Sequence, residues 1–139
     1  MPSPSAIDSV LIVGNFLHAA TGTFGVCEEL AANLASAGWR VTTTSRYWPR
    51  PQRFADMIYT VVARRRHYAV AQVDVYSGPS FLWASAVCSL LRWLRCPYVL
   101  TLHGGALPDY AAIHRDRVAA LLGSAAAVTT PSGYLRDAM

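Results

Sequence analysis

The 139-residue chain has no lysine, few charges and no long uninterrupted apolar segment. Its twelve basic residues are all arginine, charged residues make up 14% of the sequence, and the formal net charge is only +4. This charge is weaker than the clustered basic surface of a nucleic-acid-binding protein, and no nucleic-acid motif accompanies it. Because 53% of the residues are hydrophobic, some apolar surface is expected to contact a partner.

Cysteine is too sparse to build a disulfide framework or a metal site. Cys27, Cys88 and Cys96 are odd in number, widely spaced and placed in apolar helical patterns, which is typical of a cytoplasmic protein. The most apolar segment, 81–94, is interrupted by Arg92 and falls short of the roughly 20 residues that a membrane span needs. We therefore expect a buried helix there.

The length suits one domain with a core of its own. Residues 1–8 contain two prolines and lack the basic and apolar regions of a signal peptide, so they are predicted to be a loose leader. Residues 9–139 are predicted to form the single domain.

Short apolar strands alternate with helical patterns along the chain. Strands are predicted at 10–13, 41–45, 70–76, from 98 onward and at 126–129, and helices at about 25–37, 53–66, 80–94, 108–123 and after Ser132. Gly38 stands where a helix C-terminal cap would stand. This alternation predicts right-handed βαβ units, and therefore an α/β fold: a doubly wound, Rossmann-like parallel sheet with helices on both faces.

The strand that begins at Tyr98 ends in the turn His103-Gly104-Gly105. Ligands of open parallel sheets bind outside the carboxyl ends of the strands, beside a topological switch point. We predict the strand order 3-2-1-4-5, which places this switch between the first and fourth strands. The loops 14–25 and 103–105 are then expected to face each other across one crevice.

Four motifs follow one another along these elements. They are Gly14-Asn15-Phe16 with Thr21-Gly22-Thr23-Phe24-Gly25-Val26, then Asp74-Val75-Tyr76-Ser77-Gly78, then Tyr98 to Gly105, then Ala127-Val128-Thr129-Thr130-Pro131-Ser132 with Tyr134-Leu135. In this order they resemble the N-terminal domain of family 4 glycosyltransferases of GT-B fold. Each motif is weak alone, and the similarity covers nearly the whole chain.

The resemblance implies retaining transfer of a sugar, of the hexosyltransferase type, from a nucleotide-sugar to an acceptor, without a bound metal or a cofactor. In such enzymes the N-terminal domain mostly holds the acceptor, a glycan or a lipid-linked molecule. The C-terminal domain holds the nucleotide and carries a paired-glutamate motif. These 139 residues contain no such motif or second domain, so the chain is expected to be the acceptor-side half and inactive alone.

The resemblance and the residue chemistry together predict the site residues. His103 is the catalytic candidate, touching the transferred sugar as a hydrogen-bonding or charge-stabilising group and not as a general base. The alternative is that its ring binds a backbone carbonyl and fixes the turn. The residues predicted to bind the donor diphosphate are Gly22, Thr23, Gly25, Gly104, Gly105 and Ser132, and those predicted to contact the acceptor are Asn15 and His18.

Several of these residues have plainer explanations. Gly25 also suits tight packing of a helix on the sheet, and Thr23 and Ser132 also suit helix N-caps. Phe24 departs from the family pattern, which commonly has glycine at this place, and this leaves the path of the loop open.

The sequence is compatible with two other functions. The chain could be a non-catalytic binding or assembly module that forms homodimers through the apolar helix 81–94, which carries Trp83 and Trp93. A dehydrogenase is less well supported, because the first loop lacks Gly-x-Gly-x-x-Gly spacing and no acidic residue ends the strand 41–45.

Six of the twelve arginines lie between Arg46 and Arg66, with Tyr47 and Trp48 among them. Such a surface suits peripheral contact with anionic lipids at the inner face of a membrane. The alternative is a solvated helix end, because arginines at 64–66 already complement a helix dipole.

Overall fold

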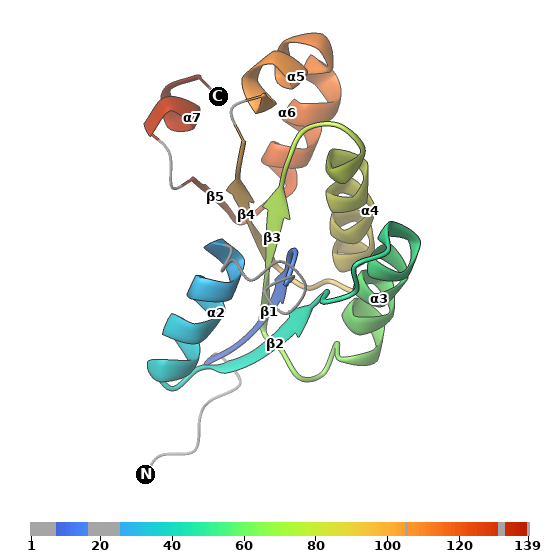
Figure 1. The fold of residues 1–139 in the computed structure, drawn as a ribbon, viewed down its shortest axis with the longest axis vertical. Helices are drawn as coiled ribbons and strands as arrows, with labels where there is room; N and C mark the ends of the chain where they lie inside the picture. The colour runs from blue at the N-terminus through green and yellow to red at the C-terminus, as the bar shows by residue number, and fades with distance from the viewer. Residues whose placement is uncertain (1–7, 17–25, 105, 131–132, 139) are drawn as a thin grey trace.

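The computed structural model describes residues 8–16, 26–104, 106–130 and 133–138, which form a five-stranded parallel sheet with helices on both faces (Figure 1). The strands are β1 (Ser9–Val13), β2 (Arg40–Thr44), β3 (Val70–Val75), β4 (Tyr98–Leu102) and β5 (Ala127–Thr129). The helices are α2 (Val26–Ser36), α3 (Arg50–Ala63), α4 (Pro79–Trp93), α5 (Leu107–Ile113), α6 (Arg115–Ser124) and α7 (Gly133–Ala138). The predicted α/β class with a parallel sheet is confirmed.

The predicted strand order is wrong. The observed order is β2-β1-β3-β4-β5, so β3 lies between β1 and β4 and not beyond β2. Five of the six β3 residues are buried, whereas β2 has the sequence Arg-Val-Thr-Thr-Thr and is partly exposed. An inner strand of a covered parallel sheet is buried on both faces, so the more apolar strand occupies the centre and the threonine-rich strand the edge. The topological switch therefore lies between β1 and β3.

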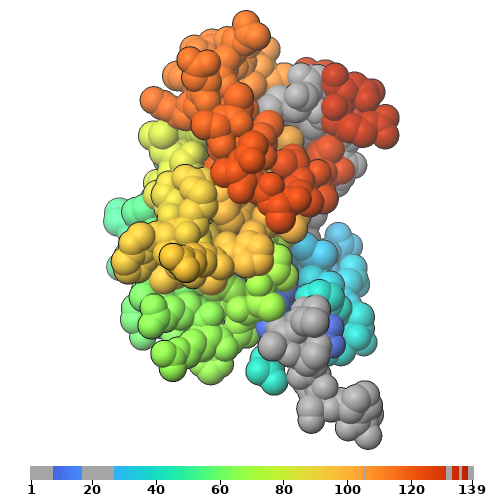
Figure 2. All heavy atoms as spheres, turned by 180° about the vertical axis from the view of Figure 1, so that it is seen from behind, coloured from blue at the N-terminus to red at the C-terminus, as the bar shows by residue number. Residues whose placement is uncertain are grey.

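The two faces of the sheet carry unequal cores. The larger core joins α3, α4 and α6 to one face of the sheet, and α4 lies between the other two helices (Figures 1 and 2). The smaller core joins α2 to the opposite face near β1, through Val10, Ile12 and Cys27. Consecutive residues of β1 thus point to opposite cores, Leu11 and Val13 into the larger one and Val10 and Ile12 into the smaller.

The apolar helix α4 is a buried helix, as its sequence predicts. Phe81, Val87, Cys88 and Leu91 have no exposed surface and pack against the sheet. No helix in the described part of the chain is long and apolar enough to cross a lipid bilayer.

Helix ends differ from the prediction at two places. α3 begins at Arg50, three residues early, because Pro51 fits the first turn of a helix, and it ends before Arg64. The prediction of a single helix at 108–123 is wrong, because α5 and α6 are separate helices. They meet at His114, whose backbone angles (φ −117, ψ 49) are not helical.

The predicted cap after α2 is confirmed. Gly38 has φ +94, and the amide of Trp39 donates a hydrogen bond to the carbonyl of Leu34 (3.0 Å), as in a Schellman motif. The predicted leader, residues 1–8, lies outside the described residues except for its last position, Asp8.

Candidate functional site

His103 and Asp74 form a buried pair at the carboxyl end of the sheet. His103 Nε2 lies 2.9 Å from Asp74 Oδ1, and the two side chains are only 7% and 3% exposed. The backbone amide of His103 also donates to the carbonyl of Val75 (2.9 Å), which fixes the residue beside the end of β3. Because the ring donates to a carboxylate, a neutral His103 carries its proton on Nε2 and keeps Nδ1 as an acceptor.

A row of polar side chains crosses the sheet and holds Asp74. Gln72 Nε2 donates to Asp74 Oδ1 (2.9 Å) and to Thr101 Oγ1 (2.6 Å), and Thr101 Oγ1 is 3.0 Å from Thr129 Oγ1. Asp74 and Thr101 are register partners on β3 and β4, as are Thr101 and Thr129 on β4 and β5. This network restrains the carboxylate and therefore the imidazole that it contacts.

Tyr76 covers one face of the His103 ring. The ring centroids are 4.9 Å apart and the planes differ by 18°, which is a stacked arrangement. Burial, together with the negative charge of Asp74, raises the pKa of Tyr76 to about 12, so its phenol keeps its proton at neutral pH. The next residue after His103, Gly104, is exposed and has φ +87, a conformation that strongly favours glycine.

Gly14 lies directly against Asp74 at the end of β1. A Cβ atom at this position would stand 2.5 Å from Asp74 Oδ2 and 3.0 Å from Cys27 Sγ. The Cys27 thiol donates to the carbonyl of Asn15 (3.4 Å), and burial followed by the charge of Asp74 raises its pKa to about 12. Cys27 is therefore a buried thiol and not a nucleophile at neutral pH.

Asn15 joins the end of β1 to helix α3. Its Oδ1 accepts a hydrogen bond from Arg53 Nη1 (3.1 Å), and Arg53 Nη2 also donates to the carbonyl of Trp48 (3.3 Å). The guanidinium lies over the ring of Trp83 at 5.7 Å, and burial lowers the pKa of Arg53. Arg53 thus restrains the side chain of Asn15, which is predicted to contact the acceptor substrate.

Of the predicted site residues, the structure describes Asn15, His103 and Gly104. Gly14, at the start of the first predicted loop, and His103 both contact Asp74, so the ends of the two loops converge even though β3 lies between them. The remaining predicted residues, His18, Gly22, Thr23, Gly25, Gly105 and Ser132, lie outside the described residues.

Sequence reasoning did not name Asp74 or Gln72 as site residues. A signal was present, because polar residues stand two apart at Gln72 and Asp74 between the apolar residues Ala71, Val73 and Val75. Side chains two apart on a strand share one face. In a strand expected to be buried on both faces, such alternation indicates a polar site on one of them.

The pair can act on a ligand through hydrogen bonds and charge. A neutral His103 offers Nδ1 as an acceptor, whereas a protonated His103 offers a charged N–H donor. Asp74 Oδ2 is buried without a hydrogen-bond partner among the described residues, and Asp74 lines a cavity of about 20 Å³, a volume large enough for one water molecule. In the described part of the chain, no three metal-binding side chains are grouped.

The fold and the site define a parallel α/β domain with a buried histidine-carboxylate pair at the carboxyl ends of β3 and β4. No protein-family model matches the sequence, and no curated protein matches it.

Proposed function

We propose that this chain is the acceptor-side, N-terminal domain of a retaining GT-B glycosyltransferase that takes its sugar from a nucleotide-sugar. The observation that carries the proposal is the Asp74–His103 pair, which lies near the topological switch, where α/β sheets bind ligands. The order of the four sequence motifs is the second support. On this proposal the chain turns over substrate only together with a donor domain.

The proposed roles follow from the contacts of each side chain. His103 hydrogen-bonds a hydroxyl of the transferred sugar and, when protonated, stabilises negative charge nearby. Asp74 and Tyr76 hold the orientation of the ring and do not react. Gly104, the exposed residue that follows His103, adds no side chain beside the buried ring.

The roles of the first loop and of the Thr-Pro-Ser turn remain part of the proposal. The loop glycines and Ser132 are assigned to the donor diphosphate, and Asn15 with His18 to the acceptor. The hydrogen bond from Arg53 to Asn15 supports the assignment of Asn15, because it places the guanidinium of Arg53 beside the proposed acceptor site.

The assembly-module alternative has weaker support. It relied on the apolar helix α4, and five apolar side chains of that helix are buried in the larger core: Phe81, Ala84, Val87, Cys88 and Leu91. Trp93, 74% exposed, and Leu82, 50% exposed, are the large apolar residues that α4 leaves on the surface. Self-association through α4 stays a prediction.

The test is a titration of the isotope-labelled chain with a panel of uridine, guanosine and adenosine diphosphate sugars, followed by NMR. We expect weak binding that shifts the amide signals of Gly14, Tyr76 and Gly104 and the ring signals of His103. His103→Ala should abolish these shifts, whereas the matched change at an exposed histidine, His67→Ala, should preserve them. A panel that moves none of these signals, or that moves the three amide signals equally in His103→Ala, would contradict the proposal.

The geometry of the pair can be checked separately. Nitrogen spectra of the free chain should show neutral His103 protonated at Nε2, and Asp74→Asn should change that tautomer or broaden the ring signals. A ring protonated at Nδ1 would refute the hydrogen bond to Asp74, whatever the outcome of the titration.

A further inference from the structure

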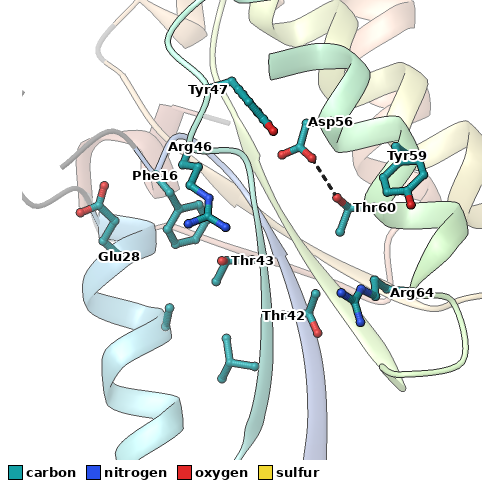
Figure 3. Close-up of a pocket in the computed structure, with 12 residues that line it drawn as sticks. Phe16, Glu28, Thr42, Thr43, Arg46, Tyr47, Asp56, Tyr59, Thr60 and Arg64 are labelled. Atoms are coloured by element: carbon teal, nitrogen blue, oxygen red, sulfur yellow. Dashed lines mark hydrogen bonds between the residues drawn. The ribbon is translucent and has the colours of Figure 1, made fainter. Parts of the chain in front are cut away.

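A groove of about 830 Å³ runs along the outer edge of β2, away from the His103 site (Figure 3). Thr42 and Thr43 of β2 form its base, Glu28 of α2 lies on one side, and Tyr59 and Thr60 of α3 lie on the other. α2 and α3 cover opposite faces of the sheet, so the groove is a sheet edge recessed between two helices.

The backbone of β2 is available in this groove. β2 is an edge strand that pairs with β1 only, within the described sheet. The carbonyl of Thr44 accepts a hydrogen bond from the amide of Gly14 (2.7 Å), so the backbone groups of Thr44 face β1. Along a strand, the backbone N–H and C=O groups of successive residues point alternately to one side and to the other. Those of Thr43, which is exposed, therefore point away from β1.

Four charged side chains line the groove, and the two arginines, Arg46 and Arg64, are the exposed ones. Arg46 lies near one end and Arg64 near the other, and both are exposed, with no hydrogen bond or ion pair of their guanidinium groups to the described residues (Figure 3). The carboxylate of Asp56 already accepts hydrogen bonds from Thr44 Oγ1 (2.9 Å) and Thr60 Oγ1 (3.4 Å). Glu28 also lines the groove, but it is buried and engaged in an interaction of its own.

We propose that this groove binds an extended, acidic segment of another protein, which adds a strand to the sheet beside β2. The outward backbone groups of β2 would pair with the segment, and the two arginines would select its acidic side chains. Exposed edge strands are templates for this kind of pairing, and β2 contains no proline or inward charge that would block it.

A second copy of the chain fits the groove less well. Two recessed edges cannot bring their strands together, because their helices meet first. Antiparallel pairing of two β2 strands would also place Arg46 of each copy near Arg64 of the other, and such like charges repel. A flat lipid surface, for its part, cannot reach the backbone of Thr43 between the helices.

The length of β2 sets the spacing of the acidic residues in the partner. Its five residues span roughly 17 Å at the usual rise of a strand. Acidic residues that reach both arginines should therefore stand about four to six positions apart, with β-branched or aromatic residues at alternate positions between them.

The test is selection of a displayed library of random peptides against the whole chain. We expect the enriched peptides to share the acidic spacing, and the double variant Arg46→Glu with Arg64→Glu to weaken their binding at least about tenfold in fluorescence anisotropy. The matched control, Arg115→Glu with Arg117→Glu, reverses two exposed arginines on α6 and should change binding less than about twofold.

A second measurement separates strand addition from simple charge attraction. Bound peptide should slow hydrogen exchange of the Thr43 amide. Peptides that bind the Arg46→Glu, Arg64→Glu variant equally well, or that leave the Thr43 exchange rate unchanged, would overturn the proposal, as would a library without binders. If vesicles of phosphatidylglycerol bind the chain through these arginines while no peptide does, the surface is a membrane contact instead.

Discussion

Replacing Gly14 by alanine tests the closest contact of the candidate site. The new Cβ would lie 2.5 Å from Asp74 Oδ2, so the carboxylate would have to retreat by roughly 1 Å to reach an ordinary contact. The hydrogen bond from His103 to Asp74 is already 2.9 Å long, and such bonds weaken beyond about 3.2 Å. The retreat therefore breaks the bond to His103 or the bond from Gln72.

The expected cost combines overpacking with a lost hydrogen bond to a buried charge. Together these effects should lower the free energy of unfolding by about 2–3 kcal/mol. For a chain of this length, about 4 °C of melting temperature corresponds to 1 kcal/mol, so the midpoint should fall by roughly 8–12 °C. Gly123→Ala is the matched control, since Gly123 lies in α6 with open space around it and alanine favours helices by about 1 kcal/mol.

Thermal and urea unfolding measure both variants, and NMR reports the His103 ring. Gly14→Ala should be destabilised and should disturb the ring signals, while Gly123→Ala should be unchanged or more stable. In an Asp74→Ala background the cost of Gly14→Ala should shrink by at least about 1 kcal/mol, because the carboxylate that meets the Cβ is gone. A Gly14→Ala variant within about 0.5 kcal/mol of the parent chain, with unchanged ring signals, would refute the reasoning.

Two further predictions concern alkaline pH and the larger core. Burial raises the pKa values of Cys27, Cys88 and Tyr76 to about 12, from 9.0 for the thiols and 10.0 for the phenol. The folded chain then keeps protons that the unfolded chain releases. The free energy of unfolding, measured in urea, should therefore fall as the pH rises from about 9 to about 12. A free energy of unfolding that stays constant up to about pH 11 would contradict the burial of these groups. Phe81→Ala, at a side chain with no exposed surface, should cost about 3–5 kcal/mol in urea unfolding. The neighbouring Leu82→Ala, at a half-exposed side chain, should cost about 1 kcal/mol or less, and similar losses at both positions would contradict the orientation of α4.

Much of the fold can be predicted from local patterns. The β-branched run before Gly14, the cap at Gly38 and the apolar helix that follows Gly78 each depend on residues close in sequence, and the structure has a strand, a C-terminal cap and a buried helix there. The break between α5 and α6 at His114 could not be predicted in this way. The apolar pattern continues across His114, while in the structure Leu107 of α5 and Val118 of α6 are both buried on either side of the break.

The candidate site could be predicted only in part. His103 stands out because it follows a buried strand and precedes glycines. Its partner Asp74 lies 29 residues earlier in the chain, and nothing local to His103 identifies it. The alternation of Gln72 and Asp74 indicates a polar face on β3, but it does not say which strand lies beside that face.

The sequence by itself determined the class of the fold, because the periods of its apolar residues specify each helix and strand and their alternation requires a parallel sheet. Only the tertiary structure decided the order of the strands. A strand's own pattern records which of its faces are buried and not which strand is its neighbour, so the position of β3 beside β1 and β4 had to come from the packed sheet. That position brings Gly14 and His103 into contact with Asp74, and it leaves β2 at the edge of the sheet.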